Sequence, residues 1–289
     1  MTVTVARPGM LTTVQDLGRR GQQHLGVPVA GPMDWWSHEA ANRLVGNEPE
    51  AALLEITLIG PELEFSRDAI AAVTGAHFEF TVSGRPGVMH QTFAVAAGER
   101  VAFGPRVSGA RAYLGVDGGF AVAEVLASRA THVRAALGGH EGRALRRGDI
   151  LPLGPATTAG RAVSSVPPTH IAAVSPAVLR AIPGPDPVPA AFWDSTFTIT
   201  PASDRMGYRL DGPSLIVDGN HLSAGVAMGT VQVRPSGTAA LLMADRATSG
   251  GYARAATVIT ADLPVAGQLA PGDRLRFSPI DAEGASGAL

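Results

Sequence analysis

The stretches AIAAVT at residues 69–74 and HFEFTV at residues 77–82 show the pattern from which the fold can be predicted. Each is a short run of β-branched, aromatic or small apolar residues beside turn-forming residues, which is typical of β-strands. Between such runs, 35 glycines and 22 prolines supply turns, and few windows of helical period are long. We therefore predict a mainly β fold of the barrel or sandwich type. Further runs of this kind occupy residues 110–116, 171–174, 238–243, 256–260 and 273–277.

One clear helix is expected at about residues 35–45. Asp34 or Ser37 is placed to cap its start, and Gly46 can close its end in a left-handed turn. A second short helix is predicted at residues 121–128. The apolar stripe of the first helix consists of Ala41, Leu44 and Val45.

The composition describes a globular protein, with 289 residues, 45% hydrophobic and 17% charged. No apolar run approaches the roughly 18 residues needed to cross a bilayer, so no membrane association is expected. The N-terminal residues lack the features of an export signal, and we expect a cytoplasmic protein. Residues 154–170 are poor in large apolar side chains, which indicates a linker and predicts domains at 1–160 and 161–289.

Several kinds of chemistry are excluded or disfavoured by what the chain lacks. A net charge of −2 gives no positive field for nucleic acid. The absence of cysteine excludes disulfides and thiolate metal sites. The absence of lysine excludes covalently attached biotin, a Schiff base and the lysine of a phosphate-binding loop. The eight histidines show no metal-ligand spacing, so no metal site is predicted.

Four blocks carry a family resemblance: residues 12–57 (TTVQDLGRRGQQHLGVPVAGPMDWWSHEAANRLVGNEPEAALLEIT), 203–210 (SDRMGYRL), 229–233 (GTVQV) and 245–252 (DRATSGGY). With them the chain resembles, nearly from end to end, the allophanate hydrolase subunit 2 family, also known as KipA or as the C component of 5-oxoprolinase. The resemblance implies two cyclophilin-like β-barrel halves with a few short helices.

Charged residues in the first block are the candidates of the N-terminal half. Asp16 and Arg19 can form an ion pair that fixes a turn, or the arginine fork can bind a carboxylate or phosphate. Asp34 is expected to be an N-cap, and an anion could also dock at this helix start. Glu55 has apolar neighbours, and a buried carboxyl group must be paired or protonated, as a general acid or base near neutral pH requires.

Two arginines, Arg19 and Arg43, are the expected partners of Glu55. The alternative interpretation of Glu55 is a structural ion pair that closes the barrel. Asn42 and Arg43 are expected to project from the helix at 35–45 toward substrate.

The second half offers Arg205 and Asp245, which lie in the blocks at 203–210 and 245–252. Beside Asp245, the pair Gly250 and Gly251 could let the backbone approach an oxyanion closely, or could simply form a tight strand turn. In the resembled family this block usually reads QTTGGYP, and here Ala247, Ser249 and Ala253 occupy the Gln, second Thr and Pro positions.

The resemblance implies a component of an ATP-dependent amidohydrolase (5-oxoprolinase) that opens 5-oxoproline to glutamate. Its partners would be a KipI-like protein, the B component, and a LamB/YcsF-like protein, the A component, with ATP at a shared or partner site. The alternatives are a carboxyltransferase subunit of a biotin-dependent, urea carboxylase-like enzyme, and a non-catalytic KipA-like regulatory protein. The predicted catalytic residues are Asp34, Glu55, Arg205 and Asp245, and the predicted substrate-binding residues are Asp16, Arg19, Asn42, Arg43, Gly250, Gly251 and Tyr252.

Overall fold

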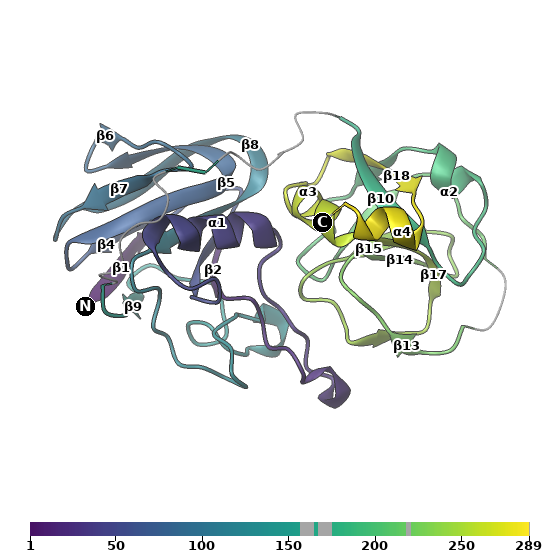
Figure 1. Ribbon diagram of the computed structural model, residues 1–289, viewed down its shortest axis with the longest axis horizontal. Coiled ribbons are helices and arrows are strands. Elements are labelled where there is room, and N and C mark those ends of the chain that lie inside the picture. The colour runs from purple at the N-terminus through teal and green to yellow at the C-terminus, as the bar shows by residue number, and fades with distance from the viewer. Residues whose placement is uncertain (157–164, 167–174, 218–220, 289) are drawn as a thin grey trace. The chain divides into compact units, whose positions relative to one another are not determined.

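A computed structural model describes residues 1–156, 165–166, 175–217 and 221–288. Contacts between residues divide the chain into two compact units (Figure 1). Unit 1 comprises Met1–Arg19 and Ala30–Ile171, and unit 2 comprises Arg20–Val29 and Ala172–Leu289. The predicted boundary near residue 160 and the predicted strand at 171–174 lie outside the described residues. In the part of the chain that the structure describes, every helix is too short or too polar to span a bilayer.

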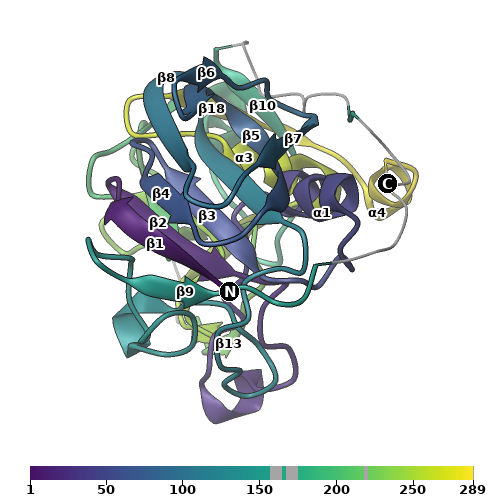
Figure 2. The same cartoon turned by 90° about the vertical axis from the view of Figure 1, so that its left-hand side faces the viewer.

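Unit 1 is an open half-barrel of antiparallel strands, hydrogen-bonded in the order β2-β3-β8-β4-β1-β9, with β5 joining β8 to the short strands β6 and β7 (Figure 2). The inward side chains, such as Leu54, Phe65 and Leu114, form one continuous apolar core. The strands are β1 (Thr2–Arg7), β2 (Leu11–Gln15), β3 (Leu53–Thr57), β4 (Glu62–Phe65), β5 (Ala69–Val82), β6 (Arg85–Pro86), β7 (Thr92–Val95), β8 (Arg100–Val116) and β9 (Ile150–Pro152).

The two runs expected at 69–74 and 77–82 form a single strand, β5, because its pairing with β8 continues across the intervening residues. The register shifts three times between Gly75 and Phe80, and Gly75 adopts a left-handed φ of 81° at the first shift. Such bulges bend and twist a strand without ending it. The run at 110–116 is likewise only the end of the 17-residue strand β8.

The predicted helix is confirmed as α1 (Trp35–Val45). The Asp34 carboxylate accepts the Ser37 N–H at 2.9 Å, an N-cap worth about 1 kcal/mol, and Gly46 ends the helix at a φ of 75°. Helix α1 packs on β5 and β8. A Cβ on Gly115 of β8 would lie 3.0 Å from the Ala41 carbonyl oxygen, so glycine permits this close approach.

The predicted helix at 121–128 is wrong, since this segment is irregular. Leu126 and Ala127 have φ values of 54° and 58°, which interrupt any α-helix. The Val125 N–H donates to the Ser128 carbonyl, and two backbone groups nearby bind side chains distant in sequence: the Arg129 N–H binds Asp16 and the Val125 carbonyl binds Arg19. Tertiary contacts therefore outweigh the local helix propensity of AVAEVLAS.

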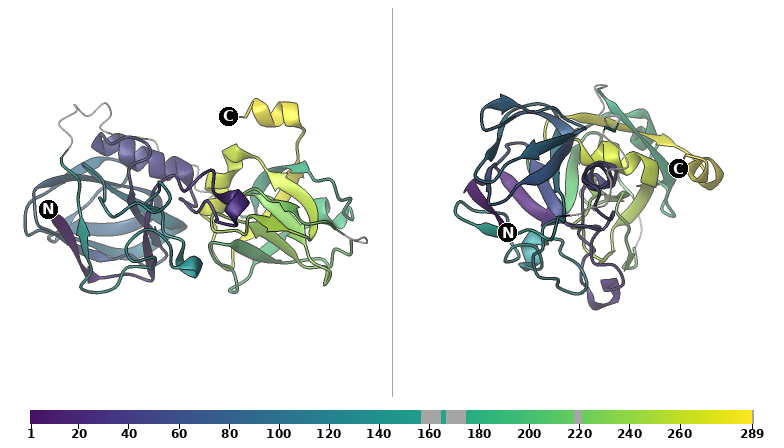
Figure 3. Two further views of the ribbon diagram at one scale, coloured as in Figure 1. Left: turned by 90° about the horizontal axis from the view of Figure 1, so that it is seen from below. Right: turned by 60° about the vertical axis from the view of Figure 1, so that its left-hand side comes forward.

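Unit 2 is a closed barrel with the strand order β10-β17-β14-β15-β12-β11-β18, in which β18 returns parallel to β10 (Figure 3). The buried Phe192 ring stacks on Phe277, and the buried Phe197 ring packs against Phe277 at a tilt. The elements are β10 (Ala177–Pro183), α2 (Ala191–Asp194), β11 (Phe197–Ile199), β12 (Gly207–Asp211), β13 (Ala224–Gly225), β14 (Thr230–Val233), β15 (Ala239–Leu242), β16 (Ser249–Gly250), β17 (Ala253–Val258), α3 (Leu263–Gly267), β18 (Arg274–Pro279) and α4 (Ala282–Ser286).

Three short 3₁₀ turns in the described residues complete the list: Gln23–Leu25 in unit 2, Val133–Ala135 in unit 1 and Thr260–Asp262 in unit 2. The prediction of a mainly β protein with two barrel-like halves and a few short helices is confirmed.

Candidate functional site

A row of buried polar side chains crosses the sheet of unit 1. Thr13 of β2 lies opposite Glu55 of β3, Glu55 lies opposite Tyr113 of β8, and Tyr113 lies opposite Thr74 of β5. Residues directly opposite in a sheet project from the same face, so the four side chains share one face. All four are buried. The row lies beneath α1, because the Thr74 hydroxyl donates to the Ser37 carbonyl at 2.6 Å.

Two predicted catalytic residues meet at the Tyr113 hydroxyl. The Tyr113 O–H donates to Glu55 Oε2 at 2.8 Å and accepts the Asp34 N–H at 2.8 Å. Glu55 Oε2 also accepts the Met33 N–H at 2.8 Å. Burial, and next the charge of Glu55, raises the pKa of Tyr113 well above its usual value, so this tyrosine stays protonated and keeps its donor. One neutral hydroxyl therefore links the Glu55 carboxylate to the start of α1.

A buried histidine lies beside this linked group. His38 Nε2 lies 3.2 Å from the Gln15 carbonyl oxygen, which can only accept, so the N–H is on Nε2. Burial lowers the pKa of His38 to about 4, although the Gln15 carbonyl and the charges of Asp16 and Glu55 oppose this. His38 is neutral near pH 7, and its Nδ1 is a buried acceptor with no hydrogen-bond partner in the described residues.

Asp16 and Arg19 both bind the irregular segment at 122–130. The Asp16 carboxylate accepts the Gly18 N–H at 2.9 Å, the Ser128 hydroxyl at 2.7 Å and the Arg129 N–H. The buried Arg19 guanidinium donates to the carbonyls of Val125 and Ala130. These contacts give both residues a structural role in unit 1, and their predicted role toward substrate stays a prediction.

Asn42 and Arg43 lie on different faces of α1. Asn42 is buried and donates to the carbonyls of Pro49 and Ala51, while its oxygen accepts from Asn47, so it holds the loop after the helix. Arg43 is exposed in the last turn of α1, where a cation is favourable. In the described contacts Glu55 accepts from Tyr113 and from a backbone N–H, and its expected partnership with Arg19 or Arg43 stays a prediction.

In unit 2, Arg205 and Asp245 form a buried ion pair. Arg205 Nε and Nη2 donate to the two Asp245 oxygens, each at 3.0 Å, and both side chains are only 5–6% exposed. The Asp245 N–H also donates to the Arg205 carbonyl at 2.8 Å. The two predicted catalytic residues of this half therefore form a bidentate ion pair, the arrangement that arginine commonly makes with a carboxylate.

Unit 2 also contains a pocket of about 390 Å³. One of its lining residues is Arg246, which follows Asp245 in the sequence. Arg246 Nε donates to the Val226 carbonyl at 3.1 Å. Burial lowers the pKa of Arg246, opposed by the charge of Asp245, yet arginine keeps its charge at neutral pH. The pocket therefore suits a small carboxylate or phosphate. The other lining residues are Gln23, Val29, Gly225, Ala227, Ala247 and Thr248.

The predicted glycine pair lies at the end of a two-stranded ladder in which β16 pairs with β13. A Cβ on Gly250 would lie 2.5 Å from Gln232 Nε2, so close packing explains this glycine. Gln232 Nε2 is buried and has no hydrogen-bond partner in the described part of the chain. Gly251 and Tyr252 are exposed. Both predicted roles of the glycine pair, a close approach to an oxyanion and a tight strand turn, stay predictions.

No group of three or more histidine, cysteine, aspartate or glutamate side chains lies close enough to hold a metal ion in the regions that the structure describes. The described residues also have no lysine to cradle a nucleotide phosphate, as the whole sequence has none. Arg246 is the cation that faces the pocket of unit 2.

A family model for the carboxyltransferase domain, subdomain A and B, matches residues 25–279. The chain belongs to this carboxyltransferase family. The family resemblance of the four sequence blocks is thereby confirmed.

This member of the carboxyltransferase family is similar to one curated protein and two solved structures over nearly its whole length. It is 36% identical over 287 residues to the C component of 5-oxoprolinase from Escherichia coli (strain K12), covering 96% of this chain and 91% of that protein. The crystal structure of TTHA0988 matches with a TM-score of 0.88 at 35% identity over 96% of this chain, which spans only 55% of that chain. The Kluyveromyces lactis urea carboxylase structure matches with a TM-score of 0.87 at 30% identity over 99% of this chain and 28% of that chain.

Sequence reasoning passed over three residues of this family member that the structure brings forward. Tyr113 gives no local signal, because its position opposite Glu55 depends on strand register. His38 was considered only as a metal ligand, although it follows Asp34 by four residues and so shares its helix face. Arg246 follows Asp245 in the sequence, and only the folded structure of unit 2 shows that it lines a pocket.

Proposed function

We propose that this chain is a component of an ATP-dependent amidohydrolase that opens 5-oxoproline to glutamate. The carrying observation is the buried group in which the Tyr113 hydroxyl joins the Glu55 carboxylate to the Asp34 backbone. The similarity over nearly the whole chain to the C component of 5-oxoprolinase supports this reaction over others.

In the proposed reaction, 5-oxoproline, ATP and two water molecules give glutamate, ADP and inorganic phosphate. We assign Glu55 and Asp34 to proton transfer during opening of the lactam, since carboxyl groups in a water-poor site can serve as general acid or base. The pocket of unit 2 with Arg246 is of a size to hold a small anion such as a carboxylate. Ala247 lines this pocket at the position where the family usually has Gln, which leaves more room for the ligand.

The chain is proposed to act with two partners, a KipI-like B component and a LamB/YcsF-like A component. Asp34 and Glu55 are buried, so substrate needs a path that the chain by itself does not offer. We propose that the KipI-like partner opens the segment before α1 and supplies most of the ATP site, because the chain has no phosphate-binding loop lysine.

The test is reconstitution of the chain with both partner proteins and measurement of 5-oxoproline-dependent ADP release. Glu55→Gln and Asp34→Asn should each lower kcat by about 10²-fold or more, as loss of a general acid or base does. Glu48→Gln, at an exposed glutamate after α1, is the matched control and should leave the rate unchanged. Undiminished ADP release without this chain would exclude the proposed role.

A second candidate is a biotin-dependent carboxyltransferase subunit, which the carboxyltransferase family match and the similarity to urea carboxylase favour. The biotin would then be attached to another polypeptide. Avidin distinguishes the two reactions, because it should abolish ATP turnover by a biotin-dependent complex and leave the 5-oxoprolinase unaffected.

A regulatory protein without catalysis is the third possibility, and the same variants address it. If Glu55→Gln, Asp34→Asn and Arg205→Met all retain partner binding and the cellular phenotype, the regulatory role is favoured. Loss of ADP release with retained partner binding favours catalysis.

A further inference from the structure

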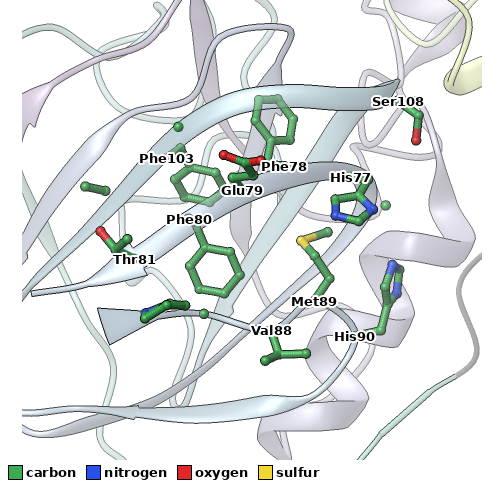
Figure 4. Close-up of a pocket in the computed structure, with 15 residues that line it drawn as sticks. His77, Phe78, Glu79, Phe80, Thr81, Val88, Met89, His90, Phe103 and Ser108 are labelled. Atoms are coloured by element: carbon green, nitrogen blue, oxygen red, sulfur yellow. The ribbon is translucent and has the colours of Figure 1, made fainter. Parts of the chain in front are cut away.

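The long hairpin of β5 and β8 opens into a second pocket, of about 920 Å³, within unit 1 (Figure 4). The three register shifts between Gly75 and Phe80 fall in the part of β5 that lines this pocket. Bulges that re-aim side chains are common beside functional sites. The volume falls in the range typical of small-molecule sites.

The floor of this pocket is aromatic and apolar. The Phe80 ring lies 5.8 Å from Phe103 and 5.1 Å from Phe93, measured between ring centroids. Met89 packs partly buried against the same core, and its flexible thioether can adapt to a bound ring. Phe80 and Phe103 are only 4% and 2% exposed, so the apolar surface that a ligand can reach comes mainly from Met89 and the exposed Val88.

Two imidazoles give the pocket a polar side. Figure 4 shows His77 and His90 on one side of Met89, with Phe80 on the other. Burial, and next the neighbouring His77, lowers the pKa of His90, so this imidazole is neutral near pH 7 and offers one donor and one acceptor. Glu79 is the acidic residue in the lining.

The backbone of His90 is fixed in an uncommon conformation. Its φ of 61° is left-handed, which costs a non-glycine residue about 1–2 kcal/mol. The His90 N–H donates to the Val73 carbonyl at 2.8 Å, and its carbonyl accepts the Val166 N–H at 3.0 Å. These two hydrogen bonds fix the backbone of His90, which places its imidazole at the pocket. Backbone strain of the kind that His90 shows is concentrated at binding sites.

We propose that this pocket binds a small organic carboxylate whose bulky apolar body lies on Val88 and Met89 and whose carboxylate faces His77 and His90. The apolar floor provides most of the affinity, and the imidazole N–H groups orient the anion. This site is independent of the function proposed above, because no residue of Asp34, Glu55 or the Arg246 pocket takes part in it.

The test is titration of the whole chain with 2-naphthoate and with its neutral analogue 2-naphthamide, followed by calorimetry. We expect saturable binding of both, with 2-naphthoate tighter. Met89→Trp, which fills the floor, should weaken both probes at least about tenfold, as expected when a ligand loses its apolar contact surface.

The polar side is tested by His90→Asn, because asparagine tolerates the left-handed backbone. This variant should lower the affinity for 2-naphthoate about tenfold, which is the lower end of the range expected for losing a hydrogen bond to a charged group. The affinity for 2-naphthamide should stay unchanged. Glu79→Gln should tighten 2-naphthoate alone. Ile150→Ala, at an exposed position on β9, is the control and should change neither affinity.

Absence of saturable 2-naphthoate binding would overturn the proposal. So would wild-type affinity in Met89→Trp, since the probe would then lie elsewhere. Equal weakening of both probes by His90→Asn would contradict recognition of the carboxylate.

Discussion

The two units hold their buried carboxylates in different ways. In unit 1, the described contacts of Glu55 include a tyrosine hydroxyl and a backbone N–H. In unit 2, Asp245 is paired with the permanent charge of Arg205. A carboxyl group with neutral donors can gain or lose a proton without leaving a partner charge buried, whereas a paired one cannot. The proposed roles follow this contrast, with proton transfer proposed for Glu55 and a fixed charge pair for Arg205 and Asp245.

The largest expected effect comes from breaking the charge pair of unit 2. Arg205→Met should lower the free energy of unfolding by about 3–5 kcal/mol, because the Asp245 carboxylate stays buried without its arginine. Denaturant unfolding measures this loss. The double variant Arg205→Met/Asp245→Leu should recover much of it, and a double variant no more stable than Arg205→Met would contradict the ion-pair account.

The next effect is a pH dependence from unit 1. His38 takes up a proton near pH 6.5 when unfolded and near pH 4 when folded. Its lowered pKa therefore contributes stability that is full above pH 6.5 and is lost as the pH falls toward 4, about 3 kcal/mol in all.

The measurement for His38 is denaturant unfolding of wild type and His38→Asn at pH 7 and pH 4.5. The variant should lose less stability than wild type over this interval, since other titrating groups are common to both proteins. Equal losses would show that His38 is protonated in the folded state.

A smaller effect is expected from removing the tyrosine hydroxyl of unit 1. Tyr113→Phe should cost about 1–3 kcal/mol, because Glu55 and the Asp34 N–H both lose a buried partner. Tyr208→Phe is the matched variant in unit 2, where the hydroxyl donates to the Ala266 carbonyl at 3.0 Å. If thermal unfolding shows that Tyr208→Phe loses more stability than Tyr113→Phe, the expectation that Tyr113 has two buried hydrogen-bond partners is refuted.

The smallest stability effect is expected at the exposed end of α1. Arg43→Gln removes only a favourable charge at the helix C-terminus, so unfolding should change by less than about 0.5 kcal/mol. A fall in ADP release by the reconstituted complex, at unchanged stability, would support the predicted substrate-binding role of Arg43. Unchanged activity would remove it from the site.

The sequence was most informative where the signal is local. Asp34 and Gly46 flank an eleven-residue helix, and each acts on backbone groups within a few positions, so α1 was predicted with its caps. The burial of Glu55 followed from its apolar neighbours. The segment at 121–128 shows the limit, because its helix propensity is overcome by contacts with Asp16 and other distant residues.

The amino-acid sequence by itself determined the family, the mainly β fold, the helix at 35–45 and the chemistry that a chain without lysine or cysteine excludes. Only the tertiary structure decided that Tyr113 faces Glu55, that β5 continues through its bulges, and that Arg246 lines a pocket. The physical reason is that caps and composition act over a few residues. Strand register and cavities instead depend on pairings between residues tens of positions apart, which no short window of sequence contains.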